Sequence, residues 1–147
     1  MQDHSYLAHH ALYLKMHIAA ICISYIAFLA ASVAALLYLI QDNALKRKSK
    51  GTISSRLPNL AFLDKIIYRS IGSGFPILTL SILSGFIWAR DLYGSYGWGH
   101  NSRQIFSIIL WLIYAVILHV RLSAKMRGRK IAFLSLFAFF VILLSIF

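Results

Sequence analysis

The sequence contains no glutamate, and its only carboxylate side chains are those of four aspartates. These aspartates stand in predicted loops or at the ends of predicted membrane spans: Asp3, Asp42, Asp64 and Asp91. A hydrolytic site built on paired carboxylates is therefore not visible. The single cysteine, Cys22, excludes an intrachain disulfide. The zinc spacings CxxC and HExxH are also missing, as is a phosphate-binding glycine loop.

Charged residues are scarce as well, at 13% of the chain, whereas 60% of it is hydrophobic. A soluble domain is usually about a quarter charged and about half apolar, so this balance indicates a membrane protein. We predict an all-α integral membrane protein with four transmembrane helices in a single domain over residues 1–147, because about 17 to 25 apolar residues cross a bilayer core. The predicted spans are about Ile18–Ile40, Ile71–Ala89, Ile105–Val120 and Ile131–Phe147.

Two further helices are expected to lie on the membrane surface. Residues 1–16 form the first, with Leu7, Leu12 and Leu14 in its apolar part. The second covers residues 60–71, where apolar residues recur at helical spacing beside charged ones, a pattern typical of an interfacial helix. Small residues at a spacing of four, such as Ala31 and Ala35 in the first span, predict close helix packing.

The net charge of +11 is compatible with nucleic-acid binding, but its distribution is not. Twelve of the 15 basic residues stand either between the first and second spans or between the third and fourth. Because cytoplasmic loops carry the excess of lysine and arginine, we predict cytoplasmic basic loops and both termini outside. The membrane would be a bacterial or organellar inner membrane. The basic loops then contact anionic lipid of the bilayer, and no nucleic-acid partner is expected.

Histidine is the most frequent residue type suited to catalysis or metal binding, and the histidines divide by depth. His17 and His100 belong to a group at or beyond the outer face, whereas His119 stands near the inner end of the third span. Ionisable residues inside a membrane are candidate functional residues. The alternative for His119 is that its ring reaches the inner headgroups beside Arg121.

Depth also limits which histidines can act together. At 1.5 Å per residue, His119 lies roughly 20 Å deeper than the outer edge of its span. Two axial ligands of one haem are about 4 Å apart, since each metal–imidazole bond is about 2 Å. His17 and His119 therefore cannot ligate the same iron. An inner site with two histidines would need a ligand from a partner membrane subunit.

Aromatic residues gather in the connection between the second and third spans. Trp88, Tyr93, Tyr96 and Trp98 stand there together with His100. Such a group offers a flat surface for a haem, and the alternative is an ordinary interfacial aromatic belt.

Several ordered blocks resemble the cytochrome c assembly membrane proteins of the CcsA and HemX type. The blocks are "FPILTLSILSGFIWA", "YGSYGWGHNSRQIFSIILWLIYAVILHVRL" and "RGRKIAFLSLFAFF", together with "MHIAAICISYIAFLAASVAALLYLIQ" and "YRSIGSGFPILTL". The resemblance covers nearly the whole chain. It implies that the chain corresponds to the C-terminal half or more of a longer family member.

The tryptophan-rich loop of that family is degenerate in this sequence. The family pattern reads approximately W-G-x-Y-W-x-W-D-P-K-E-x-W and presents haem to the apocytochrome. Here Tyr93 replaces the first tryptophan, His100 a later one, and Asn101 and Gln104 replace the carboxylates. The resemblance implies that a haem surface remains on Tyr96, Trp98 and Trp88, while synthase chemistry is left open.

The resemblance also assigns histidines. His17 falls at the family's first outer haem histidine and His119 at its transmembrane haem histidine, whereas His100, which the family pattern does not supply as a ligand, is our own candidate substitute for the second outer ligand of the resemblance. It implies a protein that binds or handles a b-type haem in cytochrome c biogenesis, with apocytochrome c as a partner and Arg90 or Arg103 meeting the propionates. The alternatives are a b-type haem electron-transfer subunit and a haem-free structural or regulatory subunit.

Overall fold

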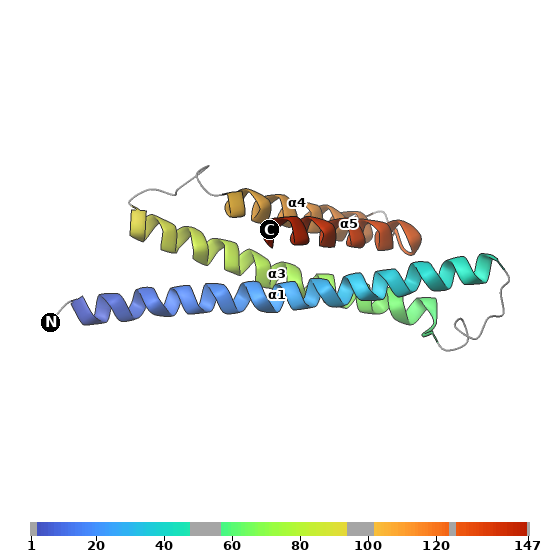
Figure 1. Cartoon of the computed structure of the whole chain (residues 1–147), viewed down its shortest axis with the longest axis horizontal. Helices are drawn as coiled ribbons and strands as arrows, with labels where there is room; N and C mark the ends of the chain where they lie inside the picture. The colour runs from blue at the N-terminus through green and yellow to red at the C-terminus, as the bar shows by residue number, and fades with distance from the viewer. Residues whose placement is uncertain (1–2, 48–56, 94–101, 124–125, 147) are drawn as a thin grey trace.

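The computed structural model describes residues 3–47, 57–93, 102–123 and 126–146, and within these ranges it contains helices and no strand. The helices are α1 (Asp3–Lys46), α3 (Leu60–Tyr93), α4 (Ser102–Ser123) and α5 (Arg129–Ile146). Figure 1 shows α1 and α3 side by side and in opposite directions, with α4 and α5 together along one side of this pair. The predicted all-α fold is confirmed for the described part of the chain.

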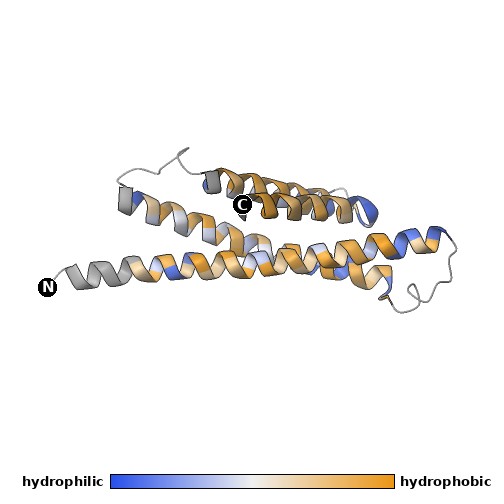
Figure 2. Ribbon diagram, in the orientation of Figure 1, coloured by the Kyte–Doolittle hydropathy of each residue, from blue (hydrophilic) through white to orange (hydrophobic). Residues whose placement is uncertain are grey.

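Three helices contain a stretch long and apolar enough to cross a membrane: Ala11–Lys46, Leu60–Arg90 and Gln104–Ser123. These stretches include the first three predicted spans. The fourth predicted span coincides with α5, whose 18 residues rise about 27 Å at 1.5 Å each. That α5 crosses the membrane stays a prediction. In Figure 2 apolar residues run along the middle of the bundle, and hydrophilic residues gather where α1 ends and α3 begins.

The prediction of two separate interfacial helices is wrong. Residues 3–16 are the first turns of α1, and residues 60–71 are the first turns of α3. No glycine or proline precedes Met16 to end a helix there. Helix α3 has an N-cap at Asn59, whose side-chain oxygen accepts a hydrogen bond from the Phe62 amide at 2.7 Å. It then continues through Pro76, which membrane helices tolerate when neighbouring groups compensate.

Phe28 lies at the point where three helices meet. Its ring stacks on that of Tyr114 from α4, with centroids 3.7 Å apart and planes 9° from parallel, and both side chains are fully buried. On the other side, a Cβ added to Gly74 of α3 would lie 2.8 Å from Phe28 Cε1. Only glycine therefore lets α3 approach this closely.

Small residues pack α1 against α5. Ala31 and Ala35 of α1 are completely buried, which confirms the packing role predicted for them. Ser135 of α5 is also buried, and its carbonyl oxygen lies 3.5 Å from the Ser32 hydroxyl of α1. Small side chains of this kind allow helix backbones to come close in lipid.

Polar side chains mark two ends of the apolar bundle. His17 of α1 bonds to Ser81 of α3 at one end, and Arg121 of α4 bonds to Asp64 of α3 at the other. Along α3 these two levels are about 25 Å apart at 1.5 Å per residue, close to the ~30 Å of a hydrocarbon core. We call them the histidine end and the basic end.

Candidate functional site

A cavity of about 380 Å³ lies at the histidine end, between α1, α3 and α4. Its lining is largely apolar, and each of the three helices adds polar or aromatic side chains: His17, Ser81, Trp88, Gln104 and Ser107. The volume falls within the roughly 300–1,000 Å³ of ligand pockets. We call it the histidine cavity. It brings two of the predicted site residues, His17 and Trp88, to one place.

The His17 imidazole is oriented by the backbone of α3. Its Nδ1 lies 2.7 Å from the Ser81 carbonyl oxygen, an acceptor, so Nδ1 carries the proton and donates it. The Ser81 hydroxyl in turn donates to the His17 carbonyl at 3.3 Å, and the Ser84 hydroxyl donates to the Ser81 carbonyl at 2.8 Å. A proton held on Nδ1 leaves the lone pair of a neutral imidazole at Nε2, which is the form that ligates metals.

Gly85 provides the space for this imidazole. A Cβ at this position would lie 2.7 Å from His17 Cε1 and 3.1 Å from Nδ1. Gly85 stands four residues after Ser81, so one face of α3 presents two small residues to the histidine ring. The sequence signal for this contact was a histidine within an apolar helix. Such a polar ring packs against small or polar residues of a neighbouring helix.

The other residues predicted to contact haem divide between described and undescribed parts of the chain. Trp88 is half-buried in the cavity lining, and Arg90 is exposed near the end of α3. Tyr96, Trp98 and His100 lie outside the described residues. The side chain of Arg103 does as well.

His119 lies away from the histidine cavity. Its side chain is exposed on α4, and its Nε2 is 3.5 Å from the Ser123 hydroxyl. It stands two positions before Arg121, at the basic end, whereas His17 is level with Ser81 at the other end. The two histidines are therefore about 20 Å or more apart along the helix axes. This spacing agrees with the expectation that they do not share an iron.

The ligand set restricts the kind of metal group that fits the cavity. Among the described residues, no three histidine, cysteine, aspartate or glutamate side chains come together. A zinc site takes three or four such ligands from the protein. A haem iron needs only axial ligands, because the porphyrin supplies the rest. The oriented imidazole of His17, beside Trp88, is a ligand of the kind that a haem iron takes from a protein.

Comparison with known proteins identifies the family of this chain. The sequence model described as "Cytochrome C assembly protein" matches residues 2–147. The chain belongs to the cytochrome c assembly protein family. The family resemblance of the sequence blocks is thereby confirmed.

Similar proteins named "Cytochrome c biogenesis protein CcsA" occur in several organisms. The chain is 32% identical over 145 residues to the protein of Guillardia theta, covering 88% of this chain and 48% of that protein. Identity to the Chlamydomonas reinhardtii protein is 36% over 130 residues, covering 88% and 35%. For Picosynechococcus it is 44% over 80 residues, covering 54% and 23%. The chain thus spans about half or less of the length of these relatives, and no solved structure matches it.

Proposed function

We propose that this chain binds haem in the histidine cavity, with Nε2 of His17 as an axial iron ligand, as part of cytochrome c assembly. The hydrogen bond from His17 Nδ1 to the Ser81 carbonyl carries this proposal, because it directs the lone pair to Nε2. The family to which the chain belongs supports the process in which it acts.

The remainder of the cavity suits the porphyrin. Apolar side chains from three helices line most of the cavity, and Trp88 offers an indole surface to a flat ligand. Arg90, near the end of α3, is our candidate partner for a propionate. His100 stands in the connection between α3 and α4, both of which line the cavity, and is our candidate for the opposite axial ligand.

His119 is proposed as a separate haem ligand at the basic end. Its exposure on α4 leaves the imidazole accessible to another membrane subunit, which would supply the opposite ligand. The distribution of basic residues supports an orientation with the basic end toward the cytoplasm and the histidine end outside. A b-type haem held at the histidine end would then be positioned for delivery to apocytochrome c.

A haem titration of the 147-residue chain in detergent tests the proposal. The Soret absorption reports binding to the wild type and to His17→Ala, Met16→Ala and Cys22→Ala. Met16 and Cys22 stand on either side of His17 in α1, and both are exposed. The Met16 thioether and the Cys22 thiol are the alternative sulfur ligands for the iron in this part of α1. We expect His17→Ala to weaken binding about 100-fold, roughly 3 kcal/mol, and the two controls to leave it unchanged.

Equal haem affinity in the wild type and His17→Ala would contradict the proposal, provided that both unfold at the same temperature. Loss of binding only in a Met16 or Cys22 variant would assign the iron to another ligand. His100→Ala adds a second readout, since removal of the opposite ligand should convert a six-coordinate spectrum into a five-coordinate one.

A further inference from the structure

A second cavity, of about 500 Å³, lies at the basic end of the bundle. Its lining includes three basic side chains, from α3, α4 and the connection before α5: Lys65, Arg121 and Arg127. Asp64 is the one carboxylate in that lining, so the cavity carries an excess of positive charge. We call it the basic cavity.

Arg121 is held rigidly and is incompletely bonded. Its Nη2 donates to Asp64 Oδ2 at 2.6 Å and to the Asp64 carbonyl at 3.1 Å, and its guanidinium lies 4.8 Å from the centre of the Tyr68 ring. The side chain is only 7% exposed. Within the described part of the chain, its Nη1 is buried and has no hydrogen-bond partner. A buried charged donor without an acceptor is costly, so this nitrogen indicates an acceptor that completes the site.

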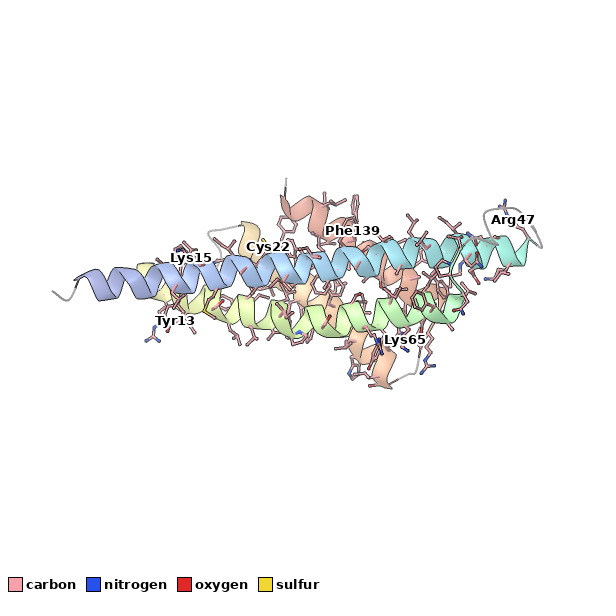
Figure 3. The ribbon with its side chains drawn as sticks, turned by 90° about the horizontal axis from the view of Figure 1, so that it is seen from below. Tyr13, Lys15, Cys22, Arg47, Lys65 and Phe139 are labelled. Atoms are coloured by element: carbon pink, nitrogen blue, oxygen red, sulfur yellow. The ribbon has the colours of Figure 1, made fainter. Side chains whose placement is uncertain are left out.

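Unlike Arg121, the other two bases of the cavity carry unneutralised charge. Lys65 and Arg127 are exposed, and neither forms an ion pair with any described residue. Figure 3 shows Lys65 on the side of α3 where the end of α4 lies. By contrast, Lys46 and Arg129 nearby both pair with Asp42, at 2.8 and 3.1 Å. Lys65 and Arg127 are therefore two of the uncompensated bases at this end, and both line the basic cavity.

We propose that the basic cavity binds the phosphate of an anionic phospholipid headgroup. The cavity lies about 25 Å along α3 from the level of Ser81, near one boundary of the apolar zone, which is the depth of lipid headgroups. A phosphate group offers several acceptor oxygens, and arginine and lysine donors bind it through charge-assisted hydrogen bonds. One oxygen would accept from Arg121 Nη1, and Lys65 and Arg127 would enclose the others.

The position of His119 separates this site from the proposed haem sites. Two residues along a helix correspond to a rotation of about 200°, so His119 and Arg121 stand on opposite faces of α4. His119 is exposed, whereas Arg121 is buried and lines the cavity. A haem whose iron is bound by His119 would therefore lie on the face of α4 opposite to Arg121. The phospholipid site does not rest on the proposed haem function.

Lipid-dependent thermal stability of the haem-free chain in detergent tests the proposal. The probes are phosphatidylglycerol, phosphatidylcholine with the same acyl chains, and inorganic phosphate. The double variant Lys65→Gln/Arg127→Gln removes two cavity charges. Its matched control, Arg69→Gln/Lys130→Gln, removes two exposed charges from α3 and α5 that do not line the cavity.

We expect phosphatidylglycerol to raise the unfolding temperature of the wild type and of the control double variant. The cavity double variant should bind this lipid about 25-fold more weakly, because each base near the surface contributes roughly a fivefold factor. Arg121→Lys, which keeps the charge but loses the guanidinium donor, should also weaken binding. His17→Ala should retain the full lipid effect, which separates this test from that of haem binding.

Equal losses in the two double variants would overturn the site, since they would show diffuse surface attraction. A response to phosphatidylcholine as large as that to phosphatidylglycerol would overturn the preference for anionic lipid. Stabilisation by inorganic phosphate alone, with none from phosphatidylglycerol, would overturn the lipid as the source of the phosphate.

Discussion

Gly85→Ala places a methyl group against the proposed iron ligand. The new Cβ would lie 2.7 Å from His17 Cε1, 3.1 Å from Nδ1 and 3.3 Å from Nε2, too close for the imidazole to keep its position. The ring must move, and the 2.7 Å hydrogen bond from Nδ1 to the Ser81 carbonyl must lengthen or break. The substitution therefore disturbs the orientation of Nε2 without removing the ligand.

The effects on stability and on haem affinity should differ. Loss of one hydrogen bond costs about 0.5–1.5 kcal/mol. Alanine in a helix gains about 0.5–1 kcal/mol over glycine, so the free energy of unfolding should change by less than about 1 kcal/mol. Loss of the group that orients a metal-ligating histidine typically weakens metal binding 10- to 100-fold. We expect haem affinity to fall by about tenfold or more.

Gly72→Ala is a matched control in the same helix. A Cβ at Gly72 meets nothing within 4 Å, so this variant should bind haem like the wild type and be slightly more stable. Haem titration followed at the Soret band and thermal unfolding of the haem-free proteins supply the two measurements. Wild-type haem affinity in Gly85→Ala, or an equal loss in Gly72→Ala, would refute the argument that Gly85 leaves room for the ligand.

Three further changes test how the bundle is held together. Gly74→Ala places a Cβ 2.8 Å from the fully buried Phe28 ring and should lower the free energy of unfolding by about 1–3 kcal/mol. An unchanged unfolding temperature would contradict this, because it would show that α1 and α3 can move apart at this contact at no cost. Asp64→Asn leaves the buried Arg121 guanidinium without its counter-ion and should cost about 3–5 kcal/mol, seen in denaturant unfolding in micelles, whereas a cost below about 1 kcal/mol would contradict it. Trp111→Phe removes the 2.9 Å indole bond to Thr79, which should cost about 0.5–1 kcal/mol, and a double-mutant cycle with Thr79→Val should recover most of that cost as coupling energy.

Local patterns were sufficient for the helices but not for all of their boundaries. The apolar runs predict the middle part of each helix, because a transmembrane helix needs about 17 to 25 apolar residues in a row. Residues 60–71 have the amphipathic pattern of a surface helix, yet α3 includes them. The pattern reports which face is apolar and not where a helix bends or stops. Here Pro76 does not end α3, which continues to Tyr93.

The candidate site was predicted only in part, because its contacts join distant positions. His17 and Trp88 were recognised from their residue types, but the bond from His17 to Ser81 joins residues 64 apart in sequence. The ion pair of Asp64 with Arg121 spans 57 positions. Such contacts depend on the register of one helix against another. The sequence alone does not determine this register. The position of Asp64 among many basic residues was nevertheless a signal that its carboxylate would form an ion pair.

Rescue of His17→Ala by free imidazole tests most directly whether this side chain ligates the iron. Removal of the imidazole should leave space for a free imidazole beside Gly85, which the wild-type ring contacts closely. If His17 is the axial ligand, added imidazole should restore haem binding and a histidine-type Soret spectrum in this variant, with no effect on the wild type. If His17→Ala instead gives the wild-type haem spectrum without added imidazole, His17 is not an iron ligand and the account is contradicted.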